Sequence, residues 1–149
     1  MGLQQEVMNQ MKIAMKAKDK VALESLRAIK SALLLAKTES ASDEEMNEEA
    51  EIQLVQKLVK QRKDSATIFI DQGRSDLAEP ELAQIAVIEQ FLPEQLSEEE
   101  IEKVVVETIA STGASGMKDM GKVMGMVSKA LAGQADGKTI STIVKRKLM

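Results

Sequence analysis

The sequence predicts an all-α fold, and three observations support this prediction. Apolar residues recur every three or four positions along most of the 149 residues, which is the period of a helix with one buried face. The apolar side chains are mainly aliphatic or methionine, with ten Met, two Phe and no Trp or Tyr, whereas strands favour aromatic and β-branched residues. The alternation of polar and apolar residues that marks a half-buried strand is not found.

Four amphipathic helices are expected over residues 1–92, where they would form an N-terminal four-helix bundle. Asp19 is the predicted cap of the second helix, Ser42 and Glu45 form a predicted capping box for the third, and Gly73 ends that helix. The four expected buried stripes share helical spacing and comprise, in turn, Leu3, Val7, Met11, Ala14 and Met15; Ala22, Leu26, Ile29 and Leu33; Ala50, Leu54, Leu58, Ala66 and Phe69 or Ile70; and Leu82, Ile85, Ile88 and Phe91.

Pro80 leaves two alternatives for the start of the fourth helix. If the helix begins near Glu79, the proline lies in its first turn, where the missing N–H has no helical partner to lose. If the helix begins near Asp76, the proline interrupts the helical hydrogen bonds. Pro93 ends this helix, because the residue before a proline disfavours helical backbone angles.

A small three-helix domain is expected over residues 97–149. It opens with a capping box at Ser97–Glu100, its second helix covers roughly residues 117–131, and Asp136 caps its last helix. Two glycines end the first and second helices of this domain, Gly113 and Gly133. The last helix has an expected buried stripe of four residues, Ile140, Ile143, Val144 and Leu148.

Charge is distributed unevenly along the chain. The whole sequence carries 20 Lys/Arg and 24 Asp/Glu, a net charge of −4. From Met117 onward there are seven basic and two acidic residues, so this part is at +5 and the preceding part at −9. An asymmetry of this kind predicts that the C-terminal helices meet an anionic partner.

Several classes of site are excluded by composition. Cys and His are absent, which removes disulfides, Cys/His zinc sites and catalytic Ser-His or Cys-His pairs. The acidic clusters at Asp43–Glu51 and Glu98–Glu102 fall in expected first turns of helices, where the helix dipole favours carboxylates. We therefore assign no metal site, no cofactor and no catalytic residue. The longest apolar runs are too short to span a bilayer, and a cytoplasmic protein without membrane contact is expected.

Four long stretches of the sequence carry a resemblance to a known family. They are LVKQRKDS (58–65), GRSDLAEPELAQIAVIEQFLPEQLSEEEI (73–101), TGASGMKDMGKVMG (112–125) and GQADGKTISTIVKRKL (133–148). In this order they resemble the YqeY family, and the resemblance runs over nearly the whole chain. That family is similar to the tail of GatB, the B subunit of the glutamine-dependent aspartyl/glutamyl-tRNA amidotransferase.

The resemblance implies an all-helical fold, a helical bundle joined to a smaller helical domain, and a link to tRNA. The GatB tail is understood to hold the body of the tRNA while the catalytic domain works on its acceptor end. Members of the family are commonly labelled as glutamine-dependent carbon–nitrogen ligases through this kinship. The sequence departs from the enzyme in lacking a counterpart of the ATP- and metal-using domain and of the amidase Ser-Ser-Lys site. It also departs from the family pattern at Pro80, where a charged run is usual.

Nine residues of the C-terminal domain are candidate nucleic-acid-binding residues. They are the seven basic residues and two glycines, Lys118, Lys122, Lys129, Lys138, Lys145, Arg146, Lys147, Gly121 and Gly125. The basic side chains would contact phosphates, or they are solvated residues that suit a helix C-terminus. Each glycine costs about 1 kcal/mol of helix propensity. Close packing between helices is the favoured explanation for the glycines, and approach of an RNA backbone is the alternative.

Three hypotheses for function follow. The first is a binding module that engages tRNA or a tRNA-processing enzyme through the C-terminal domain. The second is a component of a carbon–nitrogen ligase with glutamine as amido-nitrogen donor, which the resemblance alone implies; autonomous catalysis is not expected, because no nucleotide site or catalytic group is identified. The third is a protein–protein interaction module that docks through the acidic bundle.

Overall fold

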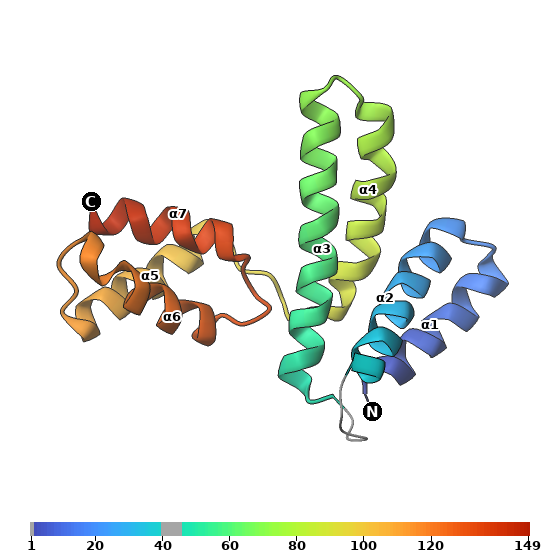
Figure 1. Ribbon diagram of the computed structural model, residues 1–149, viewed down its shortest axis with the longest axis horizontal. Helices are drawn as coiled ribbons and strands as arrows, with labels where there is room; N and C mark the ends of the chain where they lie inside the picture. The colour runs from blue at the N-terminus through green and yellow to red at the C-terminus, as the bar shows by residue number, and fades with distance from the viewer. Residues whose placement is uncertain (1, 40–45) are drawn as a thin grey trace. The chain divides into compact units, whose positions relative to one another are not determined.

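The computed structural model describes residues 2–39 and 46–149, which form helices joined by loops (Figure 1). The elements in chain order are α1 (Leu3–Ala17), α2 (Lys20–Glu39), α3 (Glu48–Asp71), α4 (Ser75–Ile88), the 3₁₀ turn η1 (Glu89–Phe91), α5 (Glu98–Thr112), the 3₁₀ turn η2 (Met117–Asp119), α6 (Met120–Ala130) and α7 (Gly137–Leu148). No strand occurs in these residues. The all-α prediction is confirmed.

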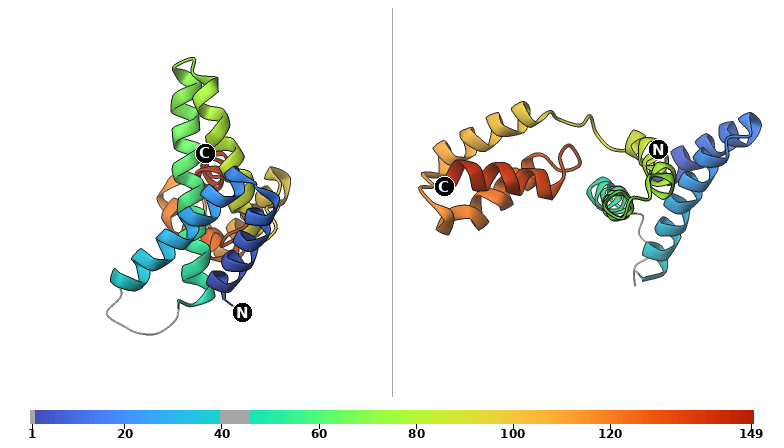
Figure 2. Two further views of the ribbon diagram at one scale, coloured as in Figure 1. Left: turned by 90° about the vertical axis from the view of Figure 1, so that its right-hand side faces the viewer. Right: turned by 90° about the horizontal axis from the view of Figure 1, so that it is seen from above.

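The chain divides into two compact units, each with a hydrophobic core of its own. The first unit ends at Leu92 and contains α1 to α4, and the second spans Pro93–Met149 and contains α5 to α7. In the first unit, α1 pairs with α2, α3 pairs with α4, and α2 packs on α4, as both views of Figure 2 show. Its core comprises the buried residues Leu3, Val7, Ala14, Leu26, Ile29, Val55, Val59, Ile85 and Ile88.

Three predicted helix caps are confirmed, and together they fix where α2, α5 and α7 begin. The carboxylate of Asp19 accepts a hydrogen bond of 3.0 Å from a backbone N–H in the first turn of α2. Ser97 and Glu100 form the reciprocal capping box at the start of α5. Asp136 accepts a hydrogen bond of 2.7 Å from the backbone N–H of Thr139 in α7. Each cap satisfies donors that a helix start leaves without a helical partner.

The third helix differs from the prediction at its start and on its buried face. It begins at Glu48, and the side chain of Asn47 accepts a hydrogen bond of 2.8 Å from a backbone N–H in its first turn. The predicted capping box of Ser42 and Glu45 lies outside the described residues. The buried positions are Val55, Val59 and Ala66. Ala66 was predicted, whereas Val55 and Val59 lie one residue later than the predicted Leu54 and Leu58, which are half-buried beside them.

The turn between α3 and α4 ends α3 where it was predicted. Gly73 has a φ of 73°, the left-handed conformation that glycine adopts without a steric cost. The N–H of Arg74 donates to the Phe69 carbonyl at 2.7 Å, and the Arg74 guanidinium pairs with the Asp76 carboxylate through two hydrogen bonds of 3.0 Å. This pair lowers the pKa of the Asp76 carboxyl.

Helix α4 begins at Ser75, so the earlier of the two predicted starts is the observed one. Pro80 consequently lies inside the helix and leaves the Asp76 carbonyl without its helical donor. Both residues are exposed, so water can satisfy that carbonyl. Leu82, predicted to be buried on this helix, is 50% exposed.

The second unit is a three-helix arrangement in which α5, α6 and α7 each pack on the other two. The segment before α5 is tied to the loop between α6 and α7, because the side chain of Gln95 donates to the Gly133 carbonyl at 2.6 Å and the Leu96 N–H donates to the Gln134 carbonyl at 2.9 Å. Its core comprises Ile101, Val105, Val123, Val127, Leu131, Ala135, Ile140, Ile143, Val144 and Leu148. The predicted stripe of α7 is confirmed.

Candidate nucleic-acid interface

The basic residues before and on α6 are exposed and unpaired. Lys118 lies in η2, and Lys122 and Lys129 lie on α6. All three are exposed, and their ammonium groups make no hydrogen bond or ion pair with any other described residue. Lys122 and Lys129 are seven residues apart, so two helical turns place them on the same face. The buried residues of this helix, Val123 and Val127, point to the opposite side.

Helix α7 presents a second pair of free lysines. Lys138 and Lys145 are exposed and lie seven residues apart on one face, and their ammonium groups have no partner among the described residues. Their face is turned away from the buried stripe of α7. The two ammonium groups are solvated, and an anion can bind them without displacing another group of the protein.

Arg146 and Lys147 differ from the other five cations because both pair with Glu102 of α5. The Arg146 guanidinium lies 3.4 Å from one carboxylate oxygen of Glu102 and the Lys147 ammonium lies 2.5 Å from the other. The hydrogen bond from Lys147, followed by the charges of Lys147 and Arg146, lowers the pKa of the Glu102 carboxyl. These two cations therefore join α7 to α5 as well as facing solvent.

The structure overturns the favoured explanation for the two glycines of α6. Gly121 and Gly125 are exposed, and beyond the adjoining residues and backbone of α6 itself, a β carbon built on either would meet no described atom within 4 Å. Close helix packing thus does not offset their cost in helix propensity. The two glycines do share one face of α6, as their spacing of four residues predicts, but that face is turned away from the core.

Charge in the second unit is sorted by helix and cancels over the unit. Pro93–Met149 contains eight Lys/Arg and eight Asp/Glu side chains. The acidic residues gather on α5, which carries Glu98, Glu99, Glu100, Glu102 and Glu107. The +5 therefore belongs to the part of the chain that forms η2, α6 and α7, and any anionic partner is expected on these elements.

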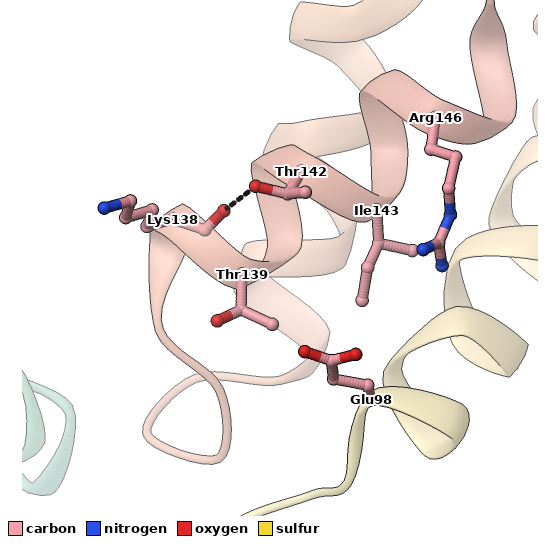
Figure 3. A pocket seen from close by; sticks show the side chains of 6 residues that line it. All are labelled: Glu98, Lys138, Thr139, Thr142, Ile143 and Arg146. Atoms are coloured by element: carbon pink, nitrogen blue, oxygen red, sulfur yellow. Dashed lines mark hydrogen bonds between the residues drawn. The ribbon is translucent and has the colours of Figure 1, made fainter.

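A pocket of about 180 Å³ lies where α5 and α7 begin (Figure 3). It is lined by Glu98, Lys138, Thr139, Thr142, Ile143 and Arg146. In Figure 3 the carboxylate of Glu98 faces Thr139 and Ile143 across the pocket, while the Lys138 ammonium points away from the other labelled side chains. The hydroxyl of Thr142 donates to the Lys138 carbonyl at 3.0 Å.

Sequence reasoning missed Glu98, Thr139 and Glu102 as parts of the site. Glu98 was interpreted only as a first-turn carboxylate, and nothing in the spacing reveals that α5 and α7 start beside each other. The signal that was available for Glu102 is the basic run Lys145–Lys147, which can pair with a carboxylate on a neighbouring helix.

A comparison with known families decides the classification. The sequence model of the Yqey-like protein family matches residues 4–148. The chain belongs to the YqeY family. The match covers nearly all of the described residues, so the resemblance found in the four sequence stretches is confirmed.

Two relatives extend this comparison of the YqeY-family chain. The E subunit of the glutamyl-tRNA(Gln) amidotransferase of Thermococcus gammatolerans is 40% identical over 73 residues, which are 46% of this chain and 12% of that protein. The chain thus spans about an eighth of the length of this relative. Altered inheritance of mitochondria protein 41, mitochondrial, of Pyrenophora tritici-repentis is 31% identical over 127 residues, which are 84% of this chain and 68% of that protein.

The described residues contain neither a metal-binding cluster nor a helix that could span a membrane. No group of three or more Asp or Glu side chains in residues 2–39 and 46–149 is arranged to hold a metal ion. Within the same residues, every helix is too short or too polar to cross a membrane.

Proposed function

We propose that this YqeY-family protein is an RNA-binding accessory module, with tRNA as its RNA, that contacts phosphates through η2, α6 and α7. The observation that carries the proposal is that α6 combines lysine side chains without partners and glycines whose backbone is exposed to solvent. Lys122 and Lys129 are exposed without partners, and Gly121 and Gly125 on the same helix are open to solvent. A glycine that costs helix propensity without a packing role is expected where a ligand backbone approaches closely.

The kinship with part of a tRNA amidotransferase supports tRNA as the partner. The relative from Thermococcus gammatolerans is named for action on glutamyl-tRNA, and it shares sequence with about half of this chain. The shared part is 12% of that protein, so the activity of the whole relative is not transferred to this chain. The proposal gives this chain a holding role, without a catalytic residue of its own.

The test is a titration of the full chain with bulk tRNA at increasing salt concentration. Phosphate contacts release counterions, so the logarithm of the affinity should fall linearly with the logarithm of salt, by about 0.7 to 0.9 per contacted phosphate. The double variant Lys122→Ala/Lys129→Ala should weaken binding and reduce that slope by about 1.5. The matched control is Lys12→Ala/Lys16→Ala on α1, where two exposed lysines are removed from the other unit.

Two outcomes would overturn the proposal. One is that the wild-type chain does not bind tRNA at low salt. The other is that the α1 control weakens tRNA binding as much as the α6 variant does, because net charge alone would then explain the attraction.

A further inference from the structure

The pocket between α5 and α7 offers hydrogen-bond donors and charged groups of both signs. Both helices begin at its rim: Glu98 is the first residue of α5, and Gly137 is the first residue of α7. Both starts are capped, α5 by the hydroxyl of Ser97 and α7 by the carboxylate of Asp136, so they contribute little net positive charge. The guanidinium of Arg146 adds a full charge, and only one of its five N–H donors is used in the contact with Glu102.

Glu98 places a negative charge in this environment and has no partner for it. Its carboxylate lines the pocket and makes no hydrogen bond or ion pair with any other described residue. A simple anion bound by Arg146 would be repelled by this carboxylate. A ligand that suits the whole pocket must therefore bring a hydrogen-bond donor to Glu98 together with an anionic group for Arg146.

The remaining side chains of the pocket limit which ligands it can bind. The Thr142 hydroxyl is used within α7, and the Lys138 ammonium points outward (Figure 3). The polar groups left to a ligand are the Thr139 hydroxyl, the Glu98 carboxylate and the Arg146 guanidinium, with Ile143 as an apolar wall. The volume of about 180 Å³ equals roughly six water molecules at about 30 Å³ each, which is room for one sugar and its phosphate.

We propose that this pocket binds one ribose-phosphate unit of RNA and distinguishes it from DNA. The ribose 2′-hydroxyl donates to the Glu98 carboxylate, and the adjacent phosphate accepts hydrogen bonds from Arg146 and Thr139. Carboxylates recognise ribose hydroxyls in other proteins by the same chemistry, and the 2′-hydroxyl is the group by which proteins tell RNA from DNA. A deoxyribose offers Glu98 no donor and leaves its charge beside a phosphate. The inference rests on the proposed RNA binding and assigns the sugar selectivity within it.

The experiment compares three single-stranded oligonucleotides of equal length on the full chain: oligouridylate, its 2′-deoxy counterpart and its 2′-O-methyl counterpart. The wild type should bind the ribose form about fivefold more tightly than the deoxy form, the net effect of about one hydrogen bond. The 2′-O-methyl form keeps an RNA-like sugar conformation but cannot donate, so it should bind like the deoxy form.

The variant Glu98→Ala should bind the deoxy form more tightly than the wild type does and should bring the ribose-to-deoxy ratio close to one. Glu99→Ala is the matched control, because Glu99 is the next residue of α5, is exposed and carries the same charge. It should raise both affinities equally and leave the ratio unchanged.

The inference fails if the wild type binds the ribose and deoxy forms equally, or if Glu98→Ala keeps the wild-type ratio; RNA binding by the lysines would then still stand. It also fails if the 2′-O-methyl form binds as tightly as the ribose form, a result that requires no variant. Absence of binding to every oligonucleotide and to tRNA overturns the proposed function itself.

Discussion

At the scale of single residues, the exposed glycines of α6 separate stability from function. Gly125 lies inside α6 with open space where a β carbon would be. Gly125→Ala should therefore raise the free energy of unfolding by about 1 kcal/mol. If an RNA backbone approaches this face, the added methyl group should weaken tRNA binding in the same variant.

Urea unfolding and tRNA titration of one preparation measure both effects. Ser128→Ala is the control, because it also raises helix propensity on the exposed side of α6 but adds no atom. Stabilisation of Gly125→Ala with unaltered tRNA binding would contradict an RNA role for this face.

The ion pairs of Glu102 give the protein a pH dependence with a defined sign. Lys147 and Arg146 lower the pKa of Glu102 in the folded state, so the pairing stabilises the fold above the usual pKa of a glutamate and is lost as the pH falls through the lowered value. Glu102→Gln should therefore melt below the wild type at pH 7, and the two melting temperatures should converge as the pH is lowered from neutral through the reduced pKa of Glu102. Glu107→Gln, which removes an exposed carboxylate of the same helix, should show a smaller difference at pH 7. A constant gap across this range would show that the pairing has no part in stability.

At the scale of elements, Pro80 should lower the stability of α4. It lies inside the helix and removes one hydrogen bond to the Asp76 carbonyl. Pro80→Ala restores the donor on an exposed surface, so unfolding in urea should require about 1 kcal/mol or more of additional free energy. Pro93→Ala, outside any helix, is the comparison and should lack this gain. An unchanged or lower stability for Pro80→Ala would mean that the proline relieves strain at the start of α4.

The four cations of α7 should fall into two pairs when their charges are reversed. Lys138→Glu/Lys145→Glu should leave helicity and melting nearly unchanged, because both ammonium groups are unpaired. A carboxylate at position 138 interacts favourably with the dipole at the start of α7, and this offsets the unfavourable carboxylate at position 145 near its end. Arg146→Glu/Lys147→Glu should lower the melting temperature, since both new carboxylates would face Glu102. Circular dichroism with thermal melting separates the two cases. Equal melting of both variants would show that the contacts with Glu102 do not hold α7 to α5.

Local chemistry explains which elements could be predicted. The caps at Asp19 and Ser97 were predictable because they depend on residues three apart. Two buried positions of α3 lie one residue later than predicted, because Leu54 and Val55, and likewise Leu58 and Val59, both satisfy helical spacing. Only the packing partner decides between such neighbours. The packing prediction for the two glycines of α6 was wrong for a similar reason. The sequence shows that they share a face of the helix, but it does not show whether that face is turned to the core or to solvent.

The site depended on information that no local pattern contains. Lysines on α6 and α7 could be selected from composition, and the structure shows which of them are free. The pocket required α5 and α7 to start at the same place, which follows from the tertiary fold of the second unit alone. Glu98 and Glu102 lie 40 or more residues from the α7 side chains beside them, so their roles could not be predicted from spacing.

At the scale of the whole molecule, the two units should differ in autonomy. A fragment of residues 1–92 should stay helical, because it keeps the complete core of α1 to α4. A fragment of residues 93–149 has a core of aliphatic residues without an aromatic side chain, in a size range where stability is marginal, and should melt well below the intact chain. Circular dichroism of both fragments measures this. A stable second fragment, or an unfolded first one, would contradict the expectation.

The separation of the two cores has a consequence for spectroscopy. Because the chain has no Trp or Tyr, its near-ultraviolet emission is almost dark, and one introduced tryptophan would be the sole fluorophore. Phe91 packs against the core of the first unit, so the wavelength of maximum fluorescence of Phe91→Trp would report whether that unit is folded. The second unit would contribute no tryptophan fluorescence, but its helices would contribute to the far-ultraviolet circular dichroism. In one denaturant titration, the fluorescence would give the unfolding midpoint of the first unit. Any further loss of circular dichroism outside that transition would belong to the second unit.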